Sequence, residues 1–233
     1  DGTYDMIILC LHQRIAIQMV QEALPKIPAG TILVDTCGLK GRMVRDLTYR
    51  CRKADVRYVG THPMAGREKN GYYASIPNLF QNANLIVTPV DGTDEAALDT
   101  VKELADQMGF GKIVTATPMW HDNMIAYTSQ LAHVVSSSYV KDFCMDDALS
   151  FSGGSFQDMT RVATMDESMW AALFLDNRYH LDLLIENLTD YRDALKQRDE
   201  ERLQYLIAEG RQIQEENVRK RQEQNELQKG ETA

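Results

Sequence analysis

Residues 58–75 read YVGTHPMAGREKNGYYAS, and the rest of the chain is organised around this segment. An apolar run over residues 56–59 leads into it and predicts a short buried strand. Four residues that favour sharp turns follow within a dozen positions: Gly60, Pro63, Gly66 and Gly71. We therefore expect His62 in a loop at the end of a strand, where open α/β sheets bind ligands and an imidazole can act as an acid or base. The alternative is a loop histidine that hydrogen-bonds its own backbone.

Length and composition indicate an ordinary soluble globular protein. The 233 residues suffice for one large domain or two small ones, and 44% hydrophobic with 25% charged residues is ordinary for such proteins. The net charge of −9 argues against nucleic acid as a partner. No apolar run is long enough to cross a membrane, and none resembles a signal peptide.

The cysteines and histidines indicate neither disulfides nor a metal site. None of the four cysteines shows CxxC spacing, so reduced thiols in a cytoplasmic protein are the simplest account. The five histidines are scattered, without an HExxH motif or a Cys/His cluster, and we expect no bound metal.

The order of apolar patterns predicts two domains. Strand-like runs at residues 5–11, 31–34, 56–59, 84–88 and 112–115 alternate with helical patterns at 13–24, 39–52 and 94–108. This alternation is typical of a parallel Rossmann-type sheet with crossover helices, here over residues 1–117. From Pro118 on only helical patterns remain, at 121–139, 157–164, 166–174, 178–195 and 200 to about 223. They predict a helical domain over residues 118–233, with a solvated, frayed end beyond residue 215.

The glycine loop of a dinucleotide site is missing from this sequence. No GxGxxG follows any of the predicted strands, and no GxxxxGK(S/T) is present. The chain begins with Asp1 rather than Met and opens almost directly into a strand. We therefore expect the first βαβ unit, with its pyrophosphate loop, to lie upstream of Asp1. The chain as given is then expected to bind a cofactor weakly or not at all.

Two further segments carry polar residues that could serve a site. Residues 121–133, HDNMIAYTSQLAH, place Ser129, Gln130 and His133 side by side on a mostly apolar helix. These side chains either satisfy one another in the core, which is the commoner case, or line a pocket.

Residues 153–161, GGSFQDMTR, end in an arginine on a short helix. The planar fork of Arg161 suits a carboxylate, although a salt bridge to Asp158 or another acidic neighbour is the simpler role for a lone arginine. Trp170 follows nine residues later, and core packing is its default role.

Together these segments resemble the prephenate/arogenate dehydrogenase family of tyrosine biosynthesis. The matching segments are VDTCGLKG at 34–41, GTHPMAGREKNG at 60–71, HD at 121–122, SQLAH at 129–133, GGSFQDMTR at 153–161 and MW at 169–170. The resemblance extends over nearly the whole chain. HPMAG-x-E-x-x-G followed by S-x-L-x-H is a specific combination, unlike a lone glycine pattern.

The resemblance implies a Rossmann-type domain followed by a helical domain that forms a homodimer. It implies oxidative decarboxylation of prephenate to 4-hydroxyphenylpyruvate, or of arogenate to tyrosine, with NAD or NADP. His62 would be the catalytic base at the ring hydroxyl, and Arg161 would hold a substrate carboxylate. Four further residues would contribute to substrate binding: Glu68, Gln130, His133 and Trp170. Glu68 and Trp170 would lie near Arg161 and gate the pocket. We expect the loop after the second strand to contribute to cofactor binding through Asp35, Thr36, Cys37 and Gly38.

Two positions depart from the family pattern. Gln130 stands where the family often has a histidine, and it cannot titrate. Gly38 stands where the family often has a serine that helps to hold the catalytic histidine. His62 is then less well oriented, or supported by Thr36, Cys37 or water.

Two other functions remain open at this point. One is a related two-domain oxidoreductase that acts on another substrate, which the formation of an aromatic product from prephenate would exclude. The other is a non-catalytic helical dimerisation module with a remnant sheet, which cofactor binding by the full-length protein would exclude.

Overall fold

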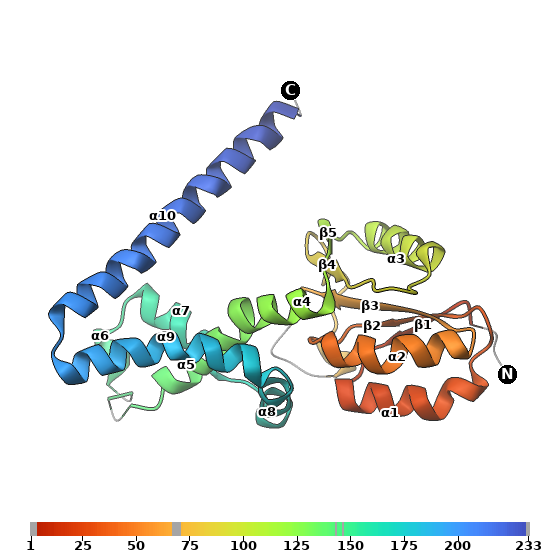
Figure 1. Cartoon of the computed structure of the whole chain (residues 1–233), viewed down its shortest axis with the longest axis horizontal. Helices are drawn as coiled ribbons and strands as arrows, with labels where there is room; N and C mark the ends of the chain where they lie inside the picture. Colours follow the sequence, from red (N-terminus) through yellow and green to blue (C-terminus); the bar gives the residue numbers. More distant parts are fainter. Residues whose placement is uncertain (1–3, 67–70, 143, 146, 232–233) are drawn as a thin grey trace. The chain divides into compact units, whose positions relative to one another are not determined.

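The computed structural model describes residues 4–66, 71–142, 144–145 and 147–231 (Figure 1). The chain divides into two compact units, Asp1–Leu181 and Asp182–Ala233. The first unit contains the sheet and most of the helices, and the second contains the remainder of one helix and a long C-terminal helix.

A five-stranded sheet with strand order β1-β2-β3-β4-β5 forms the centre of the first unit. Its strands are β1 (Met6–Leu9), β2 (Ile32–Asp35), β3 (Arg57–Pro63), β4 (Asn84–Val87) and β5 (Lys112–Thr115). The pairs β1–β2, β2–β3 and β4–β5 are parallel, whereas β3 and β4 are antiparallel. The predicted Rossmann-type sheet is confirmed, with one antiparallel pair that the alternation of patterns did not indicate.

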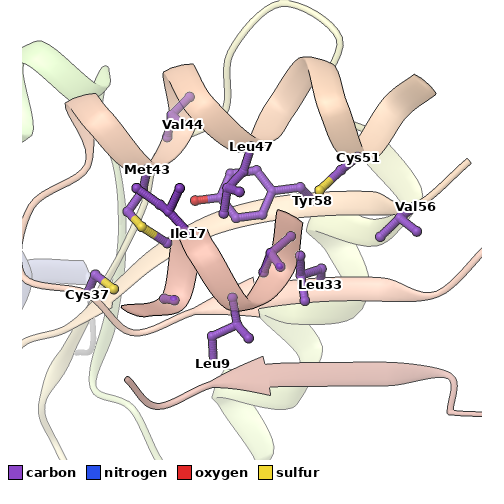
Figure 2. Packing of buried hydrophobic residues seen from close by; sticks show 12 residues of the cluster. Leu9, Ile17, Leu33, Cys37, Met43, Val44, Leu47, Cys51, Val56 and Tyr58 are labelled. Carbon is purple, nitrogen blue, oxygen red and sulfur yellow. The ribbon is translucent and has the colours of Figure 1, made fainter. Parts of the chain in front are cut away.

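Helices cover both faces of this sheet. They are α1 (Gln13–Ala23), followed by the 3-10 turn Leu24–Lys26, then α2 (Gly41–Lys53) and α3 (Glu95–Gln107). Successive residues of β2 point to opposite faces. Leu33 therefore packs with α1 and α2 (Figure 2), whereas Ile32 and Val34 pack with α3 on the other face. The buried residues of each helix recur at helical spacing, which is why the sequence pattern located these helices within two residues.

Strand β3 is longer than the sequence predicted, and this changes the position of His62. His62 pairs with Ile86 of β4 and therefore belongs to the strand, so the prediction of a loop position was wrong. The strand continues because Gly60 allows β4 to approach closely: a Cβ there would lie 2.7 Å from Thr88 Oγ1. Glycine therefore marks a close backbone contact here rather than the beginning of a loop.

The helical part of the first unit begins at a well-defined cap. Thr117 accepts a hydrogen bond from the Trp120 backbone N–H (3.2 Å), and Pro118 takes the first helical position. A continuous helix follows, composed of α4 (Pro118–Ile125), the π-turn Ala126–Gln130 and α5 (Leu131–Tyr139). Next come α6 (Ala148–Phe151), α7 (Gly154–Thr160), the 3-10 turn Arg161–Ala163 and α8 (Glu167–Asp176). A π-turn shifts the faces of the helix on either side of it, which an α-helical spacing rule does not anticipate.

The second unit is helical. Helix α9 (Arg178–Gln197) extends into it from the first unit and is followed by α10 (Glu200–Glu231). The predicted end near residue 223 was wrong, because α10 continues to Glu231. Ion pairs four residues apart, such as Lys220 with Glu216 at 2.7 Å, accompany the polar part of the helix.

Among the described residues, no helix combines the length and the apolar character needed to span a membrane. All four cysteines are free, Cys37 and Cys51 buried and Cys10 and Cys144 exposed.

Candidate active site

A buried ion pair lies beneath the loop that follows β2. Lys40 and Asp35 are both 0% exposed, and the Lys40 ammonium group donates to the Asp35 carboxylate and to the backbone carbonyl of Thr61. The same carboxylate accepts a hydrogen bond from the Tyr58 hydroxyl (2.7 Å) and from the Cys37 backbone N–H (2.8 Å). The pair therefore fixes the loop against β3 one residue before His62.

This network also keeps two nearby groups uncharged. Burial, with Asp35 next in importance, raises the pKa of Tyr58 well above its usual value. Burial likewise raises the pKa of the Cys37 thiol to about 12, with Asp35 again adding to the shift. Cys37 is therefore a protonated thiol and not a nucleophile.

His62 projects from β3 toward two different surroundings. Its Nδ1 lies 2.9 Å from Nε2 of His121, with the two rings edge to face. Its Nε2 faces the loop at Gly38, where a Cβ atom would lie 4.0 Å from that nitrogen. Burial of the ring, then His121, then the Lys40 ammonium group lower the pKa of His62 to about 3. His62 is therefore a neutral imidazole with one nitrogen toward the Gly38 loop.

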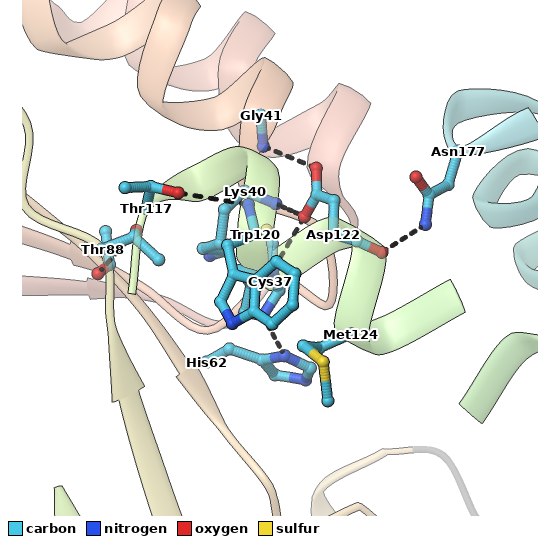
Figure 3. Close-up of polar contacts among 12 residues, drawn as sticks. Cys37, Lys40, Gly41, His62, Thr88, Thr117, Trp120, Asp122, Met124 and Asn177 are labelled. Carbon is cyan, nitrogen blue, oxygen red and sulfur yellow. Dashed lines mark hydrogen bonds and ion pairs between the residues drawn. The ribbon is translucent and has the colours of Figure 1, made fainter. Parts of the chain in front are cut away.

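His121 and Asp122 connect this ring to the start of α2. Figure 3 shows Asp122 beside Lys40 and Gly41. His121 is 1% exposed, and its Nδ1 lies 2.7 Å from Oδ1 of Asp122. The Asp122 carboxylate also accepts hydrogen bonds from the backbone N–H groups of Lys40 (2.7 Å) and Gly41 (2.8 Å). These donors begin α2, where the helix dipole favours a negative charge. Asp122, His121 and His62 thus form a chain of polar contacts from a helix N-terminus to the end of β3.

A second cluster joins His133 and Trp170. Their rings stack with centroids 3.7 Å apart and planes inclined by 25°, and the carbonyl oxygen of Ser129 lies 2.9 Å from His133 Nδ1. Trp170 lies on α8, and Leu173 one turn later brings its Cδ2 within 4.0 Å of the Cβ position at Gly38. Helix α8 therefore connects the His133 cluster with the surroundings of His62.

Gln130 is fully buried and its side-chain amide is engaged at both ends. Its Nε2 donates to the Leu173 carbonyl (3.2 Å), and its Oε1 accepts from Asn177 Nδ2 (2.8 Å). Asn177 Nδ2 also donates to the backbone carbonyl of Asp122 (2.9 Å). Of the two roles open from the sequence, these contacts support satisfaction in the interior rather than direct contact with a substrate. Gln130 holds the C-terminal end of α8 against the π-turn that follows α4.

The structure gives positions for Arg161 and for the predicted cofactor loop, but not for Glu68. Arg161 begins the 3-10 turn that packs against α5, the helix that carries His133. Glu68 lies outside the described residues. The Asp35 carboxylate is taken up by the buried network, and within the predicted cofactor loop it is Gly38 that lies near His62. In the described part of the chain, no group of three His, Cys, Asp or Glu side chains could hold a metal ion.

Support for His62 comes from His121, for which the sequence had suggested no role. Thr36 donates to the Leu9 carbonyl (3.2 Å) and Cys37 to the Leu11 carbonyl (3.4 Å), so neither side chain supports the His62 ring as had been suggested. His121 does so instead, from the opposite side of the ring. The adjacent His121 and Asp122 were visible in the sequence, but only the fold brings them to His62, 59 residues away.

Family comparisons agree with this arrangement over most of the chain. Residues 2–115 match the model of the prephenate dehydrogenase nucleotide-binding domain. Residues 117–209 match the model of the prephenate dehydrogenase dimerization domain. The chain belongs to the prephenate dehydrogenase family.

Curated relatives in this family are moderately similar in sequence. Cyclohexadienyl dehydrogenase of Zymomonas mobilis is 30% identical over 207 residues, which cover 84% of this chain and 69% of the relative. Prephenate dehydrogenase of Bacillus subtilis is 30% identical over 181 residues, covering 74% of this chain and 48% of the relative. The chain thus spans between about half and about two-thirds of the length of these family members.

Solved structures in the family share the fold. The prephenate dehydrogenase from Aquifex aeolicus in complex with hydroxyphenyl propionate and NAD+ has a TM-score of 0.71 and 26% identity, covering 91% of this chain and 77% of that one. A putative prephenate dehydrogenase from Corynebacterium glutamicum has a TM-score of 0.71 and 29% identity, covering 82% and 62%.

Proposed function

We propose that this chain carries the active site of an NAD-dependent dehydrogenase that oxidatively decarboxylates prephenate or arogenate. Family membership and the names of the relatives support the reaction class. The observation that carries the proposal is the environment of His62. Its ring is neutral, held from the Nδ1 side, and presents Nε2 to the loop at Gly38.

In the proposed reaction His62 is the general base. Hydride leaves the ring carbon that bears the hydroxyl group, carbon dioxide is lost, and the ring becomes aromatic. Nε2 of His62 accepts the hydroxyl proton as the C–H bond breaks, and returns it to the oxygen atom once decarboxylation has made the ring a phenolate. No net proton is released. A neutral imidazole suits both transfers because it can accept a proton and give it back.

Three predicted residues are proposed to hold the substrate. Arg161 would bind a carboxylate through its planar guanidinium group. His133 and Trp170 would contribute a flat surface, which their stacked rings support. Glu68 remains a prediction, and Gln130 would act indirectly by holding the end of α8.

NAD is the proposed cofactor. We place its site at the edge of the sheet beyond the ends of β1 and β2, where two features are compatible with a bound ligand. The space at Gly38 lies beside His62, and the side-chain amide of Gln13, at the start of α1, is buried without a hydrogen-bond partner among the described residues. An unsatisfied buried amide at the carboxyl edge of a sheet is a group that a bound ligand can satisfy. NAD, when bound, supplies the hydride acceptor. Thr36, Cys37 and Gly38 would border its reactive end.

We further propose two domains, residues 1–117 and 118–233, and a homodimer formed by the helical domain. The matches to the two family models meet between residues 115 and 117, which supports that boundary, although the compact units separate later, after Leu181. The description of the second model as a dimerization domain supports the homodimer. Four free cysteines are compatible with the expected cytoplasmic location.

The proposed function is tested by incubating the enzyme with NAD and either prephenate or arogenate. Reduced cofactor and an aromatic product should form in equal amounts with at least one of the two substrates. Reduction of the cofactor only with some other substrate would indicate a related oxidoreductase. Absence of both cofactor binding and turnover would indicate a non-catalytic module.

A further inference from the structure

We infer that His121 and Asp122 are positioning residues that fix the tautomer of His62 and share the proton that His62 takes from its substrate. The inference rests on the proposed function of His62 as a base. It concerns a separate property, however, because the tautomer of His62 can be measured without any turnover.

The tautomer follows from the hydrogen bonds of Asp122. An ionised carboxylate only accepts hydrogen bonds, and Asp122 already accepts from two backbone N–H groups. Nδ1 of His121, 2.7 Å from Asp122, must therefore carry a proton. In a neutral His121 the other nitrogen, Nε2, is then an acceptor, so the proton between the two rings belongs to Nδ1 of His62. His62 is left with a bare Nε2 toward Gly38, which is the form a base requires.

This chain of contacts is anchored at its far end. Asp122 binds the first residues of α2 through both carboxylate oxygens, and its backbone carbonyl accepts a hydrogen bond from Asn177. A Cβ atom at Gly41 would lie only 2.9 Å from the carboxylate, so glycine allows the close approach. An anchored carboxylate holds the His121 ring in one orientation, and that ring in turn holds His62.

The same contacts provide a place for the proton. When the substrate O–H bond breaks, an N–H bond forms at Nε2 of His62, and the proton on Nδ1 of His62 moves to Nε2 of His121. His62 is neutral again, and the positive charge rests on His121 beside the Asp122 carboxylate. The reverse transfers return the proton to the phenolate oxygen, so atoms and charges balance over the cycle.

The surrounding charges favour this displacement. The Lys40 ammonium group disfavours a positive charge on His62, and lowers the pKa of its ring together with burial and His121. His121 has an anionic partner in direct contact, whereas the carboxylate of Asp35 is already paired with Lys40. A proton shared with His121 is therefore better compensated than one confined to His62.

The first test is the tautomer of His62 in the unaltered protein. With histidine labelled with 15N, long-range 1H–15N correlation spectra distinguish a protonated from a bare ring nitrogen. The His62→Gln variant identifies the signals of His62 among those of the five histidines. We expect a protonated Nδ1 and a bare Nε2 at pH 7. A protonated Nε2, or equal populations of both tautomers, would overturn the inference.

Two substitutions then separate tautomer control from proton sharing. The carbonyl oxygen of His121→Gln can still accept from Nδ1 of His62 but cannot take a proton, whereas His121→Leu can do neither. His62 should keep its tautomer in the glutamine variant and lose it in the leucine variant. In active enzyme kcat should fall in both, further for leucine, by roughly 10²-fold or more. KM should hardly change, because a side chain that is 1% exposed does not contact the substrate.

His180→Gln is the matched control, because it removes a histidine outside this chain of contacts, where the imidazole packs on Tyr179. Its kcat should equal that of the unaltered enzyme. If His121→Leu does not fold, the tautomer of His62 in the labelled unaltered protein and the kcat of the glutamine variant still test the inference. A folded His121→Leu variant with unaltered kcat would refute the positioning role. Failure of the unaltered enzyme to form an aromatic product would instead refute the proposed function, and leave the tautomer measurement standing.

Discussion

The Lys40 ammonium group is paired with the Asp35 carboxylate in the interior of the first unit, where neither side chain is exposed. The pair joins the end of β2 to the carbonyl group of Thr61, the residue before His62. Residues 35–41 thereby acquire a fixed conformation that also directs two backbone N–H groups toward Asp122. One buried ion pair thus positions both the loop in front of His62 and the anchor behind it.

Breaking this pair should strongly destabilise the protein. Lys40→Met leaves an unpaired buried carboxylate, and we expect a loss of about 3–5 kcal/mol in the free energy of unfolding, measured by urea denaturation. Lys40→Met combined with Asp35→Asn should be less destabilised than the sum of the two single variants, because the stranded charge is removed. Additive effects would show that the two side chains do not act as a pair.

Gln130 should matter for stability rather than for chemistry. Gln130→Leu removes one of the two acceptors of the Asn177 side-chain amide and the side-chain donor to the Leu173 carbonyl. We expect a loss of about 1–3 kcal/mol in the free energy of unfolding. Gln130→Glu retains an acceptor for Asn177 but not the donor, and serves as the matched comparison. A large fall in kcat with unchanged stability would return Gln130 to the direct contact with the substrate that the sequence suggested.

The sequence predicted the elements of the fold well, because their signals are local. Each strand and helix of the sheet domain is marked by its own apolar period, and β5 was located to the residue. The direction of β4 was not predictable in this way, since an antiparallel and a parallel strand share the same apolar run. His62 was therefore placed in a loop that is in fact the paired end of β3.

The candidate site was predicted only where a residue is recognisable by itself. His62, His133 and Trp170 were singled out from their segments, and the last two form a stacked pair. Lys40 and His121 were missed because their roles depend on partners 21 and 59 residues away. A charged side chain five residues after Asp35 was visible in the sequence, but nothing local indicated that it is buried.

Arg161 is expected to bind a substrate carboxylate. Arg161→Ala should then raise KM by an amount that corresponds to about 2–5 kcal/mol of lost binding. Arg161→Lys should recover only part of this, because an ammonium group lacks the planar fork. Steady-state kinetics with prephenate and with arogenate measure both variants. An unchanged KM in the alanine variant would assign Arg161 to a structural role.

The helical half is expected to form a homodimer with an interface of about 2,000 Å² or more. Large apolar residues are exposed on α9 and α10: Leu183, Leu188, Leu195, Ile207 and Ile213. Light scattering at micromolar concentration should give twice the mass of the chain. Leu195→Glu combined with Ile213→Glu should shift the protein toward monomer, whereas Gln107→Glu on α3 should not. A monomeric unaltered protein would contradict this expectation.

His62 should remain an active base well below the usual histidine range. Its pKa is lowered by burial, by His121 and by Lys40, while Asp122 faces it only through His121. The folded protein therefore protonates His62 at lower pH than the unfolded chain, whose histidines titrate near about 6.5. Between these values the unfolded state binds more protons, so the contribution of His62 to stability is complete above about pH 6.5 and declines as the pH falls.

Two measurements on the His62→Asn variant check this expectation. In the unaltered enzyme kcat/KM should stay level as the pH falls from 8 through about 6.5, because the free base is already neutral there. The variant retains a hydrogen-bonding group but not the base, and its kcat should fall by about 10²–10⁴ with little change in KM. Its free energy of unfolding should also depend less on pH between about 6.5 and 5. An acidic limb centred near 6.5 that disappears in the variant would show that the interior does not hold His62 neutral. If the His62→Asn variant kept both the acidic limb of the pH profile and the full rate, the base would be another residue. His133 would then be the next residue to substitute.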